Sequence, residues 1–157
     1  MSLNPGETQF VVDLRAFFND NPEFFANQEM YLLRNMSRGR GIGFFEAGNF
    51  YPDFIIWLIV DGKQYVTFVD PKGIRNLEGP DDPKIQFHKT IKDIEVRMGD
   101  PNVILNSFII SNTPFQQVKW WESGIDKADL EAANVLFQKD NKETYIAQLL
   151  GAIVPVV

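Results

Sequence analysis

Hydrophobic side chains near the start of the chain recur every three or four residues, which is the period of an amphipathic α-helix. This spacing predicts a helix over residues 8–19 and, after a break at residues 19–22, a second helix that ends near residue 37. The same period returns in residues 83–98. A closing helix is expected over residues 141–151.

Shorter apolar runs predict β-strands between these helices. Residues 54–60 are apolar without interruption, as in a strand buried on both faces. Asp61-Gly62 predicts a tight turn into a returning strand over residues 64–69. Pro71 is expected to end that strand, because proline cannot donate to a central ladder. Residues 114–133 show no clear pattern, and three further strands are expected at residues 42–46, 103–110 and 134–138.

This order of elements predicts one α/β domain with a mixed β-sheet flanked by helices. A chain of 157 residues, 45% of them hydrophobic, is long enough to bury a core. We therefore expect residues 1–157 to form a single domain. We also expect that residues 1–3 are left over from cloning and that the domain is part of a larger protein.

The residue types that the chain lacks restrict its chemistry. It has no cysteine and one histidine, so thiolate zinc sites and cysteine nucleophiles are excluded, and Ser-His-Asp hydrolysis is disfavoured. Hydrolysis would have to use carboxylates, lysine, water and a hard metal ion.

The net charge of −6 argues against nucleic-acid binding by simple attraction, but the charges are unevenly distributed. Basic residues slightly outnumber acidic ones only within residues 31–98, which is the part best suited to approach a phosphate backbone. A neighbouring module would have to supply most of the DNA affinity. The sequence shows neither a bilayer-spanning apolar run nor a secretion signal, so we expect a cytoplasmic protein without a membrane partner.

Two aspartates and a lysine flank the predicted hairpin. Asp53 comes just before its first strand, and Asp70 and Lys72 follow its second strand. Antiparallel pairing brings these positions to one end of the sheet, and alternation puts Asp70 and Lys72 on the same side if the strand persists. Two converging carboxylates attract a divalent cation, and oxygen ligands select Mg²⁺ or Mn²⁺. The main-chain carbonyl of Pro71 can add a third ligand, and Lys72 can stabilise a developing phosphorane charge.

Simpler interpretations fit parts of this pattern. Pro-Asp and Asp-Pro are ordinary turn dipeptides, and an Asp-x-Lys triplet arises by chance in many proteins. A glycosidase also uses paired carboxylates, but it has no use for Lys72 at this position.

The spacing of Pro52-Asp53 and Asp70-Pro71-Lys72 around a strand pair resembles the signature of the PD-(D/E)xK nuclease superfamily. The predicted order of elements resembles that superfamily's restriction-endonuclease-like core. Longer segments resemble the C-terminal nuclease domain of helicase-linked, type III-like restriction endonucleases, over about residues 31–150. These segments are residues 31–35, 41–46, 51–58, 68–73, 111–114, 134–137 and 145–146.

The resemblance implies that Asp53 and Asp70 ligate Mg²⁺ or Mn²⁺ and that Lys72 is catalytic in cleaving DNA. It also implies an ATP-driven helicase motor on the same natural polypeptide and a methyltransferase subunit that reads the DNA sequence. Asp70 stands where many members carry glutamate, and its shorter arm could alter the metal geometry. Many members use a further acid, for which Glu29 and Glu46 are the candidates, and Glu46 is favoured because it lies nearer Asp53 in sequence.

Four arginines in the basic segment are candidate contacts to a DNA backbone: Arg34, Arg38, Arg40 and Arg75. A helix end or an exposed loop would also explain them. The alternative function is a non-catalytic module that keeps the nuclease fold for DNA docking or subunit contact.

Overall fold

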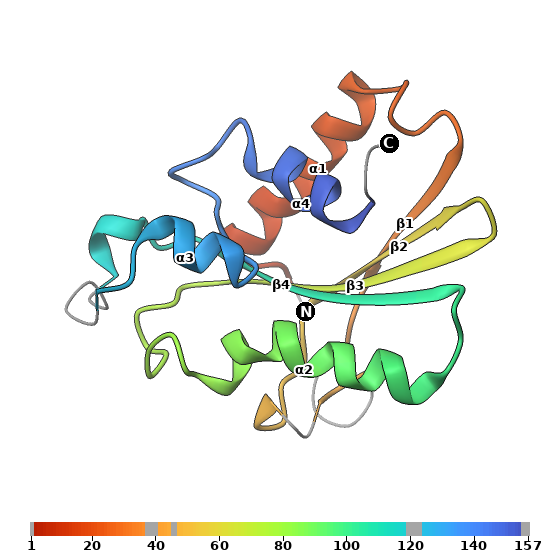
Figure 1. The fold of residues 1–157 in the computed structure, drawn as a ribbon. Helices are drawn as coiled ribbons and strands as arrows, with labels where there is room; N and C mark the ends of the chain where they lie inside the picture. The colour runs from red at the N-terminus through yellow and green to blue at the C-terminus, as the bar shows by residue number, and fades with distance from the viewer. Residues whose placement is uncertain (1, 37–40, 45–46, 119–123, 155–157) are drawn as a thin grey trace.

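The computed structural model describes residues 2–36, 41–44, 47–118 and 124–154 (Figure 1). Within them, five strands form one sheet in the order β1-β2-β3-β4-β5. The pairs β1–β2 and β2–β3 are antiparallel, whereas β3–β4 and β4–β5 are parallel, so the expected α/β class with a mixed sheet is confirmed. The strands are β1 (Gln28–Arg34), β2 (Phe54–Val60), β3 (Lys63–Lys72), β4 (Val103–Ser111) and β5 (Val135–Phe137).

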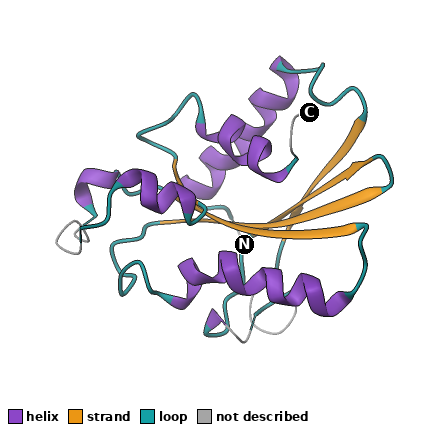
Figure 2. Cartoon of the chain, in the orientation of Figure 1, coloured by secondary structure: helices purple, strands orange, loops and turns teal. Residues whose placement is uncertain are grey.

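Helices lie on both faces of the sheet, which makes three layers (Figures 1 and 2). Helices α1 (Pro5–Asp20) and α4 (Tyr145–Ile153) cover one face, and α2 (Pro83–Met98) covers the other as the crossover between the parallel strands β3 and β4. A 3-10 turn, η2 (Phe115–Gln117), and the short helix α3 (Lys127–Ala132) connect β4 to β5. No helix in the described part of the chain is long and apolar enough to cross a membrane.

Helix α1 begins with a complete capping box. The Asn4 side chain accepts a hydrogen bond from the Glu7 main-chain N–H at 2.9 Å, and the Glu7 carboxylate accepts bonds from the Asn4 main-chain N–H at 3.1 Å and from the Asn4 amide at 2.9 Å. Pro5 occupies the first helical position, where its missing N–H is not needed. These local contacts start the helix three residues before the predicted residue 8 and fix the position of the Glu7 side chain.

The predicted hairpin is confirmed. Asp61 and Gly62 have φ values of 49° and 77°, as a two-residue primed turn requires, and Val60 pairs with Lys63 across it. The expectation that Pro71 ends the strand is wrong, because β3 continues to Lys72. The ladder with β2 stops at the Phe54–Val69 pair, so beyond that point β3 pairs with β4 alone and the missing N–H of Pro71 is tolerated.

The predicted helix from residue 22 to about 37 and the predicted strand at residues 42–46 are also wrong. Residues 28–34 form β1, whose alternate residues face the core and solvent, and pairing with β2 overrides the helical spacing of the apolar residues. Phe44 makes only an isolated bridge with Phe50, while residues 45–46 lie outside the described part. The other predicted helices and strands differ from the structure only at their ends.

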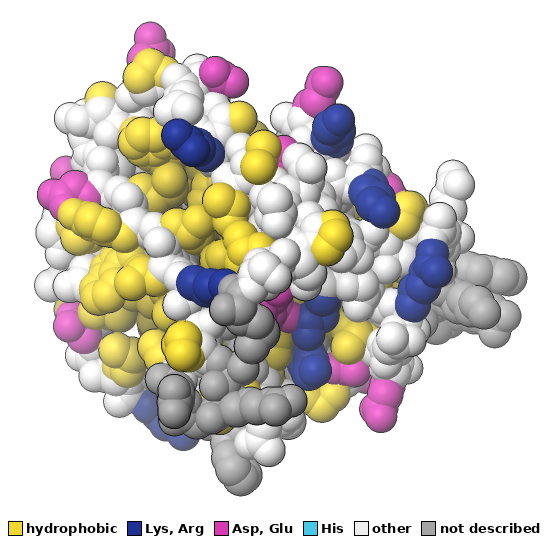
Figure 3. All heavy atoms as spheres, turned by 180° about the vertical axis from the view of Figure 1, so that it is seen from behind, with side chains coloured by type: hydrophobic (Ala, Val, Ile, Leu, Met, Phe, Trp, Pro, Cys, Tyr) yellow, Lys and Arg dark blue, Asp and Glu magenta, His cyan; other side chains and the backbone are white. Residues whose placement is uncertain are grey.

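Two apolar layers hold the sheet between its helices. Phe10 and Leu14 of α1 pack with Leu149 of α4 on one face, whereas Phe87 and Ile91 of α2 pack on the other. Helix α2 leaves the outer side of β1 and β2 uncovered. Apolar side chains therefore reach the surface there, including Tyr31, Leu33 and Trp57, and the surface seen in Figure 3 carries a broad hydrophobic area.

Replacing Phe10 with alanine should lower the free energy of unfolding by about 3 to 5 kcal/mol, because the ring is fully buried and its removal leaves a cavity. The centroids of the Phe10 and Phe54 rings lie 5.4 Å apart, so this contact packs α1 against the start of β2. Urea denaturation would measure the change. Val12→Ala on the exposed side of the same helix should change stability by less than about 0.5 kcal/mol, and equal losses in both variants would contradict this assignment.

Candidate functional site

The two predicted carboxylates meet where the β2–β3 ladder ends. Asp53 directly precedes β2, and Phe54 pairs with Val69, so the register carries Asp53 to a position opposite Asp70. The main-chain N–H of Asp53 donates a hydrogen bond to Oδ1 of Asp70 at 3.0 Å. Asp70 is 3% exposed and Asp53 is half-buried. The pairing predicted from sequence is therefore present.

Lys72 faces the same side of β3 as Asp70. Its Nζ lies 2.7 Å from Oδ2 of Asp70, and its side chain is 22% exposed. The ammonium also lies 4.9 Å from the centre of the Phe50 ring, within the range of a cation–π contact. The lysine is thus held between a carboxylate and an aromatic face, with part of its surface open to the cleft.

The pKa of Asp53 is raised to about 8, and burial is the largest cause. The charge of Asp70, a hydrogen bond with it and the charge of Glu7 contribute to the same rise, while the charge of Lys72 opposes it. In the resting protein near neutral pH, the Asp53 carboxyl therefore holds a proton that an exposed aspartate would have lost.

These groups open into a cleft of about 480 Å³. Besides Asp53, Asp70, Pro71 and Lys72, its wall includes side chains from four other parts of the chain. Lys84, in the first turn of α2, lies with its Nζ 5.8 Å from the Phe50 ring centre. The remaining polar lining comes from the residues Asn4, Glu7, Asn49 and Asn112. The cleft therefore combines three carboxylates with two ammonium groups.

Glu7 is the acid that sequence reasoning missed. It is 9% exposed, lines the cleft, and acts on the pKa of Asp53. The motif Asn4-Pro5-Gly6-Glu7 could have identified it as a helix-capping residue. Nothing in the local sequence indicates that the first turn of α1 packs beside the far end of the hairpin, because that contact depends on tertiary packing.

Asn35 is a second missed residue and holds the Pro52-Asp53 segment in place. Its main-chain N–H donates to the Asp53 carbonyl at 2.8 Å, and its amide donates to the Pro52 carbonyl at 2.8 Å and to the Ile42 carbonyl at 2.7 Å. The Ile42 N–H donates back to the Asn35 side chain at 2.9 Å. These bonds extend the β1–β2 ladder by one residue. They hold the main chain at Asp53 from the β1 side, opposite the side on which Asp70 of β3 lies.

Three other predicted site residues that the structure describes, Glu29, Arg34 and Arg75, do not line this cleft. Glu29 lies on β1 opposite Ile59, near the turn end of the hairpin, and accepts a hydrogen bond from the Tyr31 hydroxyl at 2.8 Å. Arg34 lies at the end of β1 opposite Phe54, not at a helix end, and Arg75 is exposed on the loop after β3. Three predicted residues lie outside the described residues: Arg38, Arg40 and Glu46.

The oxygen atoms of the cleft are of the kind that hard cations prefer. Among the described residues, however, no three histidine, cysteine, aspartate or glutamate side chains form a group that could hold a metal ion. A cation beside Asp53 and Asp70 would complete its coordination with main-chain oxygen, water and ligand oxygen, which is the usual condition of protein-bound Mg²⁺.

No family model matches the chain, and no curated protein or solved structure has detectable similarity to it. The function of the cleft therefore has to be inferred from its own residues.

Asp53→Asn should flatten the pH dependence of stability in the absence of metal. In the unfolded chain the pKa of the Asp53 carboxyl is near its ordinary value of 3.8, but in the folded protein it is about 8, so unfolding releases a proton between these pH values. The wild type therefore loses stability as pH rises from about 4 to about 8.

Urea denaturation in EDTA at pH 4, 6 and 8 would measure this effect, with the pH values chosen to span roughly that window. The stability of Asp53→Asn relative to the wild type should rise across it. Asp61→Asn, at the exposed hairpin turn, is the matched control and should show a constant difference. A constant difference for Asp53→Asn as well would show that the folded-state shift is absent.

Proposed function

We propose that this domain is a metal-dependent endonuclease that hydrolyses DNA phosphodiester bonds and has a restriction-endonuclease-like core. The observation that carries the proposal is the convergence of Asp53, Asp70 and Lys72, with the Asp53 N–H 3.0 Å and the Lys72 Nζ 2.7 Å from the Asp70 carboxylate. The residues lie on, or directly before, the two strands of one hairpin, at the end away from its turn, and share one cleft. Two acids that hold a metal ion, with an ammonium group beside them, can support phosphodiester hydrolysis without histidine or cysteine.

The proposed roles follow from the contacts. Asp53, Asp70 and the Pro71 carbonyl would hold Mg²⁺ or Mn²⁺, which when bound polarises a phosphoryl oxygen and lowers the pKa of a bound water. The ion pair between Lys72 and Asp70 keeps the ammonium at the cleft, where it can stabilise charge that develops on the phosphate. Asn35 and the β2–β3 register preorganise the two aspartates.

The wider assignment rests on sequence motifs. The segments around Pro52-Asp53 and Asp70-Pro71-Lys72 resemble the nuclease domain of type III-like restriction enzymes, and we propose that this chain is the cleavage module of such a system. ATP would then act only through a helicase motor on the same natural polypeptide, and a methyltransferase subunit would supply sequence recognition. Glu7 takes the place of Glu29 as a proposed further acid, because it lines the cleft. Glu46, outside the described residues, stays a prediction.

One structural observation favours the alternative, a non-catalytic module for DNA docking or subunit contact. Lys72 neutralises Asp70 and packs on Phe50, so charge balance and packing would by themselves explain why the lysine is present. Metal binding and cleavage separate the two functions, because a docking module needs neither.

Asp70→Asn and Lys72→Ala should each reduce plasmid nicking in Mn²⁺ by about a hundredfold or more, because Asp70 would hold the metal ion and Lys72 would stabilise the charge that develops on the phosphate. Nicking is measured by agarose gel electrophoresis, and circular dichroism confirms that each variant is folded. Asp61→Asn and Lys63→Ala make matching changes at the turn of the hairpin and should nick like the wild type. Equal nicking by all five proteins would indicate a contaminating nuclease and would remove the support for the site.

Millimolar Mg²⁺ or Mn²⁺ should raise the melting temperature of the wild type. At a free metal concentration ten times the Kd, the gain is about 1.4 kcal/mol, or roughly 3 to 5 °C for a domain of this size. Asp70→Asn should lose most of the shift, whereas Asp61→Asn should keep it. If metal changes the melting temperatures of the three proteins equally, the cation does not bind between the aspartates and the docking function is preferred.

A further inference from the structure

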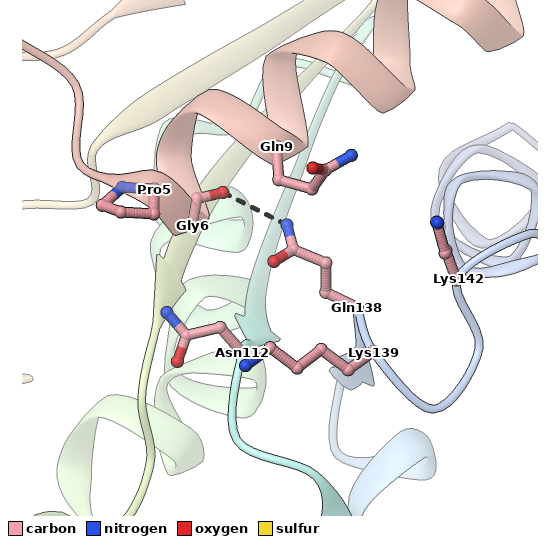
Figure 4. Close-up of a pocket in the computed structure, with 7 residues that line it drawn as sticks. All are labelled: Pro5, Gly6, Gln9, Asn112, Gln138, Lys139 and Lys142. Atoms are coloured by element: carbon pink, nitrogen blue, oxygen red, sulfur yellow. Dashed lines mark hydrogen bonds between the residues drawn. The ribbon is translucent and has the colours of Figure 1, made fainter.

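A second cavity of about 510 Å³ lies beside the candidate active cleft, at the start of α1 (Figure 4). Its polar lining comes from Gln9 on α1, Asn112 after β4, and three residues that follow β5: Gln138, Lys139 and Lys142. Gln138 is 4% exposed, and its amide is fixed by donation to the Gly6 carbonyl at 3.1 Å. The wall of this cavity is therefore anchored to the helix that also carries Glu7.

Asn112 lines both cavities and joins them. Its main-chain N–H donates to the Lys72 carbonyl at 3.1 Å, which ties it to the strand of the active cleft. Its side chain lies between two glycines. A Cβ at Gly6 would come within 2.7 Å of Asn112 Nδ2, and a Cβ at Gly73 within 3.2 Å of Asn112 Oδ1. Because Gly6 and Gly73 have no side chain, the Asn112 amide fits between the two cavities.

The two cavities differ in charge. The second contains two lysines, and none of its described lining residues is acidic, although the chain as a whole carries a net charge of −6. Neither Lys139 nor Lys142 has an ion-pair partner among the described residues. In Figure 4 the Lys139 side chain extends toward Asn112. A cavity lined by lysine and amide donors, without carboxylates, is suited to an anion with several acceptor oxygens.

We propose that the second cavity binds a backbone phosphate of the DNA strand whose neighbouring phosphate lies in the active cleft. Lys139 and Lys142 contact this flanking phosphate, and Asn112 donates to the strand between the two positions. The inference rests on the proposed nuclease function and adds the path of the substrate across the surface. It also identifies the part of an acidic domain that attracts DNA, since the cleft itself is lined by three carboxylates.

The salt dependence of DNA binding tests this site. A short fluorescent duplex is titrated with the full chain in EDTA, so that no cleavage occurs, and binding is followed by fluorescence anisotropy. Each phosphate contact contributes about 0.9 to the slope of log affinity against log salt. Between about 50 and 200 mM salt, the affinity of the wild type should therefore fall roughly twelvefold more than that of Lys139→Gln/Lys142→Gln.

The control is Lys63→Gln/Lys89→Gln, which makes the same change in net charge at two exposed lysines away from both cavities. It should keep the wild-type slope. Equal slopes for the two double variants, or no DNA binding by the wild type, would overturn the flanking-phosphate site. If the wild type binds with the predicted salt dependence but does not nick plasmid DNA, the phosphate site stands and the nuclease proposal fails.

Discussion

The antiparallel pairing of β2 with β3 is the constraint on which the candidate site depends. The turn at Asp61-Gly62 fixes the register, and the register then places Asp53 and Asp70 together at the other end of the hairpin. Burial and the charge of Asp70 make ionisation of Asp53 costly, and the Lys72 ammonium only partly offsets this cost. A fold that merely needed a stable sheet end would gain by placing neutral residues there. The arrangement is therefore more informative about function than the packing around it.

The parts of the fold that were predictable from sequence are those with strong local signals. Each of these signals acts over a few residues. The apolar run of β2 and the Asp-Gly turn predict the hairpin and the place of its two aspartates, and the proline and glycine at the ends of α2 are local signals of the same kind. Strand β1 is not predictable in this way, because Tyr31 and Leu33 on its outer side are also apolar. Its sequence therefore lacks the alternation of apolar and polar residues that marks a half-buried strand, and its apolar residues fit a helical spacing instead. Pairing with β2 decides its conformation, and that information is not local.

The candidate site also combines local and distant contributions. Asp53, Asp70 and Lys72 are joined by one turn, whereas Glu7 and Asn112 reach the cleft from α1 and the end of β4 through packing of distant elements. Asn35, just after β1, does not line the cleft but holds the Pro52-Asp53 segment. The continuation of β3 past Pro71 shows a subtler limit. Whether proline ends a strand depends on whether a neighbouring strand needs its N–H. The β2–β3 ladder stops at the Phe54–Val69 pair, before Pro71 is reached. Sequence rules about residue types thus hold only once the neighbours are known.

The capping box of α1 has a consequence for how the cleft could respond to a ligand. Both oxygens of Glu7 are already used, one by the Asn4 main-chain N–H and the other by the Asn4 amide. A cation that draws this carboxylate away from Asn4 would leave donors at the start of the helix unsatisfied unless water replaces it. Fraying of this helix end would then be thermodynamically linked to ligation by Glu7, and amide hydrogen exchange at the start of α1 would report occupancy of the cleft.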